Sequence, residues 1–74
     1  MVELARVPDL HQELFEHVRQ RTGRRVRDLA VEVRPEGVVL QGRSSSYHVK
    51  QLAQQGVRDL LPHVELRNAI VVDG

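Results

Sequence analysis

The sequence predicts a small α+β domain in which two helices and three strands follow one another in the order α-β-β-α-β. Three observations predict this class. Apolar residues recur at helical spacing in two stretches, they alternate at strand spacing in three others, and turn residues separate these stretches. The chain has 74 residues. We therefore expect a single domain over 1–74 that buries only about 60% of the surface exposed by its unfolded chain.

The composition narrows the class of protein further. Apolar residues make up 41% of the chain, and with one Phe, one Tyr and no Trp the core must be aliphatic. The absence of cysteine excludes a disulfide scaffold and a thiolate metal site. No apolar run reaches bilayer length, and Met1–Arg6 lacks the pattern of a signal peptide. We expect a cytoplasmic protein from the sequence as written, and a periplasmic or envelope-associated one if a leader was removed.

The first helix is predicted over 9–22. Asp9 is suited to cap its start, with Gln12 at the third helical position, and Gly23 is suited to end it. One apolar stripe runs along this segment, formed by Leu10, Leu14, Phe15 and Val18. The stripe predicts a helix that covers a hydrophobic core on one side.

A hairpin follows the helix, with strands over 28–34 and 37–42. Apolar and polar residues alternate in the first of them, and Pro35 and Gly37 favour the turn between the two. We place Gly42 at the end of the second strand, where a side chain would obstruct the exit towards the next helix.

The second helix is predicted over 46–61, with Ser46 as its N-cap, Ser45 as the alternative and Pro62 as its stop. Gly56 interrupts this helix and suggests close packing on the sheet. Alternation then predicts the last strand over 64–72.

The simplest topology is a two-layer sandwich with a three-stranded mixed sheet in the order 2-1-3 and both helices on one face. A right-handed crossover makes the strand 64–72 parallel to the strand 37–42, and the strand 28–34 is then central. The other face would carry a small apolar strip that is suited to a homodimer or a partner protein. It consists of Ala30, Val39, Ala69 and Val71. The last strand would also present an open edge for pairing with another chain.

The segment from Leu29 to Val72 resembles the bacterial BON domain. The matching positions are Gly37, Val39, Leu40, Gly42, Ser46, Lys50, Ala53, Val64, Leu66, Asn68, Ile70 and Val72. Two positions depart from the family pattern: Ser44 stands where an aliphatic residue is usual, and Leu61–His63 replaces the usual Pro-Gly turn. The resemblance implies a non-enzymatic module that contacts a phospholipid surface or a protein partner.

A cluster of arginines is the strongest candidate for a binding site. Ten of the eleven cationic residues are arginine, although the net charge is only +1. The arginine cluster, five residues on one short bend, consists of Arg19, Arg21, Arg24, Arg25 and Arg27. These guanidinium groups would suit an anionic phospholipid surface, where each basic residue contributes about 1 kcal/mol. The alternative is a solvated corner whose charges pair with Glu13, Glu16, Asp28 and Glu32.

Other function classes have weaker support. The alternative function is nucleic-acid binding through the same arginines, but the GxxG loop and the aromatic strand pair of common RNA-binding modules are missing. His11 and His17 fall on different faces of a helix, so we expect surface histidines and no metal site. The three serines 44–46 fit a turn and a cap better than a nucleophile. We expect no catalytic residues and no cofactor, and we expect Asn68 to satisfy a backbone group near a bulge.

Overall fold

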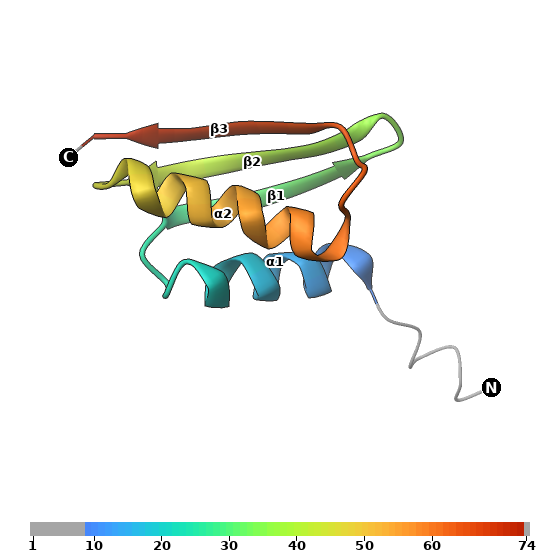
Figure 1. Ribbon diagram of the computed structural model, residues 1–74, viewed down its shortest axis with the longest axis horizontal. Helices are drawn as coiled ribbons and strands as arrows, with labels where there is room; N and C mark the ends of the chain where they lie inside the picture. Colours follow the sequence, from blue (N-terminus) through green and yellow to red (C-terminus); the bar gives the residue numbers. More distant parts are fainter. Residues whose placement is uncertain (1–8, 74) are drawn as a thin grey trace.

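The computed structural model describes residues 9–73. Residues 1–8 and 74 of the predicted domain lie outside the described residues. The five elements are α1 (Leu10–Arg21), β1 (Arg27–Arg34), β2 (Gly37–Ser44), α2 (Tyr47–Leu60) and β3 (Leu66–Val72). The α+β class and the order of the elements are confirmed. Each boundary lies within two residues of its predicted position. Figure 1 shows the two helices on the same side of the three strands.

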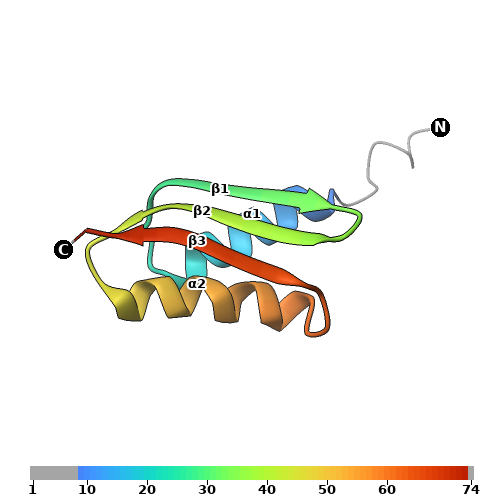
Figure 2. The ribbon, with the colours of Figure 1, turned by 90° about the horizontal axis from the view of Figure 1, so that it is seen from above.

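The sheet order is β1-β2-β3, so the predicted order 2-1-3 is wrong. β2 is the central strand, antiparallel to β1 and parallel to β3 (Figure 2). The parallel direction of β3 relative to β2 was predicted correctly, but β3 pairs with β2 and not with β1, beside which it was predicted. Charge explains the difference, because β1 carries Arg27, Asp28, Glu32 and Arg34, whereas β2 carries Arg43 alone. Charged side chains are common on edge strands, whereas a central strand is buried by both of its neighbours.

Gly42 was predicted to end the second strand, but it lies within β2, opposite a β-bulge in β1. The register shifts between Arg27 and Ala30, so that two residues of β1 face one residue of β2. Asp28 lies in this bulge with a φ of 55°. A Cβ atom on Gly42 would lie 2.7 Å from Cγ1 of Val26 and 3.0 Å from the carbonyl oxygen of Arg27. Glycine is therefore required here because the bulge brings β1 too close for a side chain.

The core lies between the sheet and the helices. It is aliphatic, as the composition predicted, and its buried residues are Leu14, Val18, Val31, Val38, Leu40, Ala53, Val57 and Ile70. Gly56 was predicted to pack on the sheet, but it packs on α1. A Cβ atom at Gly56 would lie 3.1 Å from the Cα atom of Val18, so the glycine permits the close approach of the two helices.

The caps of both helices were predicted at the correct residues. Asp9 caps α1 by accepting a hydrogen bond from the backbone N–H of His11 at 3.1 Å. Ser46, and not the alternative Ser45, caps α2 by accepting from the backbone N–H of Val49 at 3.4 Å. Ser44 supports this cap because its hydroxyl accepts from the N–H of Ser46 at 3.1 Å. The serines thus have the turn and cap role predicted for them.

Candidate binding surfaces

The structure divides the predicted arginine cluster between two places. Arg19 and Arg21 lie on the last turns of α1, where Arg19 lies 3.7 Å from Glu16 and Arg21 lies 2.8 Å from Asp59. Among the predicted acidic partners, only Glu16 is used by the cluster within the described residues. Arg21 pairs with Asp59 and Arg27 pairs with Asp73, and neither of these carboxylates was predicted from the sequence as a partner.

The other three arginines of the cluster gather at the end of the domain where α2 begins. They line an open hollow of about 480 Å³, which we call the arginine hollow. Its lining residues are Arg24, Arg25, Arg27, Ser45, Ser46, Val49 and Asp73. The hollow therefore joins the connection after α1 to the first turn of α2 and to the residue that follows β3.

Two arginines of the hollow are held by hydrogen bonds. Nε of Arg25 donates to the carbonyl oxygen of Thr22 at 3.0 Å and so helps to close the end of α1. The guanidinium group of Arg27 donates to both carboxylate oxygens of Asp73, at 2.8 and 3.1 Å, and so links the first strand to the end of the last. Both pairs fix the position of the guanidinium group at the rim of the hollow.

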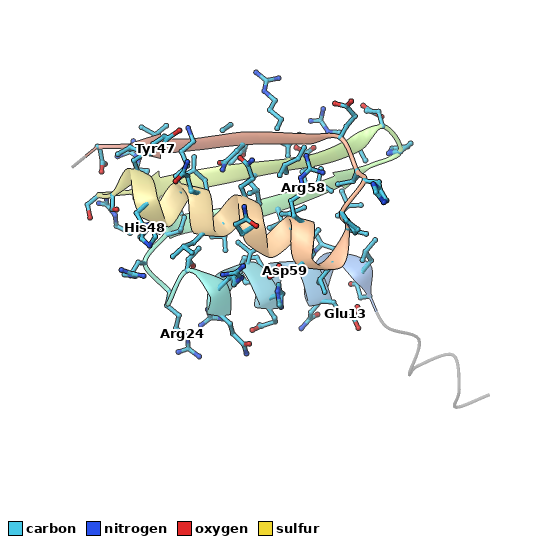
Figure 3. All side chains as sticks on the ribbon, viewed as in Figure 1. Glu13, Arg24, Tyr47, His48, Arg58 and Asp59 are labelled. Atoms are coloured by element: carbon cyan, nitrogen blue, oxygen red, sulfur yellow. The ribbon has the colours of Figure 1, made fainter. Side chains whose placement is uncertain are left out.

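Arg24 differs from the other arginines of the cluster in its surroundings and in its backbone. Its guanidinium group has no hydrogen-bond or ion-pair partner among residues 9–73, and Figure 3 shows the side chain pointing away from the body of the domain. Its φ is 60°, in the left-handed region that a non-glycine residue enters at a cost of about 1–2 kcal/mol. Gly23 shares this conformation with a φ of 64°. A strained, solvent-facing arginine is the kind of local outlier that points to a functional site.

The electrostatic character of the arginine hollow is positive. Three arginines but only one acidic residue, Asp73, line the hollow, and Asp73 already pairs with Arg27. The N-terminal end of a helix carries a partial positive charge, and the first turn of α2 contains no acidic residue. The hollow therefore has the charge and the backbone donors that suit an anionic group.

The exposed face of the sheet, which we call the open face, presents three rows of side chains. Residues in the same row are paired across the strands, and all are exposed except Val39, which is half-buried. The rows are Glu32–Val39–Arg67, Ala30–Gln41–Ala69 and Arg27–Arg43–Val71. The predicted strip of Ala30, Val39, Ala69 and Val71 does lie on this face, and its role as an interface stays a prediction. Arg43 was not assigned to this face because the second strand was predicted to end at Gly42, whereas β2 continues to Ser44.

A cluster of charged residues joins the two helices away from both surfaces. Oδ2 of Asp59 on α2 accepts hydrogen bonds from Nε of Arg21 and Nε2 of His17, each at 2.8 Å, and Figure 3 shows Asp59 on the side of α2 that faces α1. The hydrogen bond from Arg21, followed by that from His17, lowers the pKa of Asp59 from 3.8 to about 2. The same carboxylate raises the pKa of Arg21. This cluster stabilises the helix pair, and none of its three residues lines the arginine hollow.

The pKa of Asp59 predicts how stability depends on pH. Because the folded pKa lies below the ordinary value, the contribution of Asp59 to stability is present above about pH 4 and is lost as the pH falls towards about 2. We expect Asp59→Asn to be less stable than the wild type at neutral pH and equally stable near pH 2. Urea unfolding of both proteins at several pH values measures this difference, and a difference that stays constant with pH would contradict the assignment.

Asn68 has a structural role, as predicted. The bulge that was expected near Asn68 lies instead in β1. Its Nδ2 atom donates to the carbonyl oxygen of Lys50 at 2.9 Å, and its Oδ1 atom accepts from the N–H of Ile70 at 3.2 Å. The side chain thus ties β3 to α2. Three of the histidines are exposed, as expected of surface residues: His11, His48 and His63. In residues 9–73 there is no group of His, Asp and Glu side chains that could hold a metal ion.

No helix within the described part of the chain combines the length and the apolar character needed to cross a membrane. No family model matches the chain, and comparisons with curated proteins and with solved structures give no match either.

Proposed function

We propose that this chain is a non-enzymatic binding module of the BON type that contacts anionic phospholipid headgroups through the arginine hollow. The observation that carries the proposal is that Arg24, Arg25 and Arg27 line one open hollow together with residues at the start of α2. Backbone N–H groups at a helix N-terminus and guanidinium groups both bind phosphate oxygens, and a lipid headgroup supplies these oxygens at a surface.

Three of the positions that resemble the BON family support the proposal, because each of the three has a physical reason here. Gly42 accommodates the bulge, Ser46 caps α2, and Asn68 binds the carbonyl oxygen of Lys50. These contacts fix how β1, β2, β3 and α2 pack together in the fold that carries the hollow. We further propose that the two helices form one layer and the sheet the other, in a two-layer sandwich that holds this end rigid.

Tyr47 adds a second feature that favours a lipid surface. It is the first residue of α2, its side chain is 63% exposed, and Figure 3 shows it at the same end of the domain as Arg24. Tyrosine is enriched at the headgroup level of membranes because its ring is apolar and its hydroxyl is polar. An exposed aromatic ring at the end of the domain that carries the arginine hollow suits contact with a membrane surface better than contact with a free ion.

A charge reversal in the hollow is expected to weaken vesicle binding. Each basic residue near an anionic surface contributes about 1 kcal/mol, so Arg24→Glu should reduce the affinity for phosphatidylglycerol-containing vesicles by at least about fivefold. The double variant R24E/R25E should remove measurable binding. Arg34→Glu is the matched control, because it changes the net charge equally but lies at the hairpin end of β1. Co-sedimentation with vesicles of phosphatidylcholine, with and without phosphatidylglycerol, measures the binding of all three variants.

A second variant separates lost binding from lost folding. Arg24→Gly removes the guanidinium group but relieves the left-handed backbone, so it should weaken binding without lowering the free energy of unfolding. Unchanged vesicle binding of R24E/R25E would reject the hollow as the contact. Titration with single-stranded RNA at low salt tests the nucleic-acid alternative, and tight RNA binding without vesicle binding would replace the lipid proposal by that alternative.

A further inference from the structure

The rows of the open face have a symmetry that the arginine hollow does not explain. One row consists of an acidic residue, an apolar residue and a basic residue, Glu32–Val39–Arg67. The next row, Ala30–Gln41–Ala69, reads the same in both directions. In both rows the middle residue lies on β2, the central strand of the sheet.

We propose that a second copy of this chain packs on the open face about a two-fold axis that runs parallel to β2. Such an axis exchanges β1 of one copy with β3 of the other and leaves β2 over β2. Glu32 of each copy then faces Arg67 of its partner, and Val39 meets its own counterpart on the axis. The same operation places Ala30 over the partner's Ala69, and Gln41 over Gln41, where two amides can hydrogen-bond to each other.

The charges of the first row favour a two-fold axis parallel to the strands over one perpendicular to them. An axis perpendicular to the strands would keep β1 over β1 and would bring like charges together. The axis parallel to β2 forms two Glu32–Arg67 contacts for each dimer, and Arg67 has no ion-pair partner in its own chain within residues 9–73. Glu32 already pairs with Arg34 at 2.9 Å, and its carboxylate can accept from a second guanidinium group.

The geometry of sheet packing is compatible with this dimer. Strands of the two sheets would run in the same direction, and aligned sheets pack about 10 Å apart with their strands about 30° from parallel. Arginine and glutamate side chains can span this separation. Three strands offer an area at the low end of specific interfaces, so the dimer should be weak and should depend on concentration.

The third row limits the strength of the dimer. It places Arg43 near the axis, where it faces the partner's Arg43, and like charges in this position oppose association. Replacement of Arg43 by glutamine should therefore strengthen the dimer. This dependence distinguishes an interface through the whole face from one confined to the first row.

Complementary charge reversals test the proposal directly. Sedimentation velocity from about 10 μM to about 1 mM covers the affinities of weak interfaces. Glu32→Arg and Arg67→Glu should each weaken self-association by at least about tenfold, because each opposes like charges at two places. The double variant E32R/R67E, which keeps the net charge of the wild type, should associate as the wild type does.

Two outcomes would overturn the proposal. The first is a wild-type protein that stays monomeric up to about 1 mM, since this is the upper end of weak affinities. The second is a double variant that associates no better than the single variants. Glu13→Arg on α1 is the control for charge alone, and it should leave self-association unchanged. Circular dichroism of each variant confirms that the loss of association is not a loss of folding.

Discussion

Replacement of Leu40 by alanine is expected to lower the free energy of unfolding by about 3–4 kcal/mol, the largest effect of any single truncation in this domain. Leu40 is fully buried on the central strand, where it lies between Val31 of β1 and Asn68 of β3 in the register of the sheet. A truncation there removes apolar contacts and leaves a cavity that neither neighbouring strand can fill. A domain of this size has little stability in reserve, so a large fraction of the protein should unfold in mild denaturant.

Urea unfolding followed by circular dichroism measures this loss, and Leu60→Ala is its matched control. The two substitutions remove the same atoms, but Leu60 is 40% exposed at the end of α2. The Leu60 variant should lose about 1 kcal/mol or less. Equal losses at the two positions would contradict the placement of Leu40 at the centre of the sheet.

Gly42→Ala is expected to lower the free energy of unfolding by about 2–3 kcal/mol, although alanine adds only one methyl group. The added Cβ atom would lie within 3.3 Å of Val26, Arg27 and Leu29, and two of these three contacts are with backbone atoms. The φ of 149° is also one that residues with a side chain rarely adopt. The bulge would have to open, and the register of β1 beyond it would be disturbed.

A double-mutant cycle separates the side-chain contact from the backbone contacts. Val26→Ala removes the Cγ1 atom that lies closest to the added Cβ atom. The variant V26A/G42A should therefore be less destabilised than the sum of its single changes, because one of the contacts is relieved. Gln41→Ala, at the exposed neighbouring position, should change the stability by less than about 0.5 kcal/mol. A Gly42 variant as stable as the wild type would show that the bulge is not where the structure places it.

The sequence was sufficient to predict the elements of this fold because their signals are local. The stripe of α1, the alternation of β1 and the caps Asp9 and Ser46 all depend on residues within a few positions of one another. The sheet order was not predicted, since it depends on which strand edge accepts β3. The charges of β1 were a usable signal, because Glu32 and Arg34 suit an edge strand better than a central one.

The position of the bulge could not be read from the sequence. It depends on Asp28, whose left-handed backbone is uncommon, and on the contact of Val26 with Gly42 across the hairpin. Without the bulge, Gly42 reads as the end of a strand, and Arg43 is left unassigned. Because the second strand was predicted to end at Gly42, Arg43 was not placed on the open face. The arginines on this face are Arg27, Arg34, Arg43 and Arg67.

The candidate site was predicted in part. The sequence identified the five arginines of the cluster, but it could not show that Asp59 would pair with Arg21 or that Asp73 would pair with Arg27, because these carboxylates lie 38 and 46 positions away along the chain. The structure was needed to show that the other four arginines have partners and that Arg24 has none among residues 9–73. The unpaired, strained Arg24 is the residue on which the proposed function depends most.

A titration followed by two-dimensional ¹H–¹⁵N NMR tests the central claim most directly. The labelled protein is mixed with micelles of a short-chain phosphatidylglycerol and, separately, with micelles of a short-chain phosphatidylcholine. The proposal predicts that phosphatidylglycerol shifts the amide signals of residues 24–27 and 45–49, and that phosphatidylcholine leaves them unchanged. Shifts confined to the strands of the open face, or no shifts with either lipid, would contradict the assignment of the arginine hollow as the lipid contact.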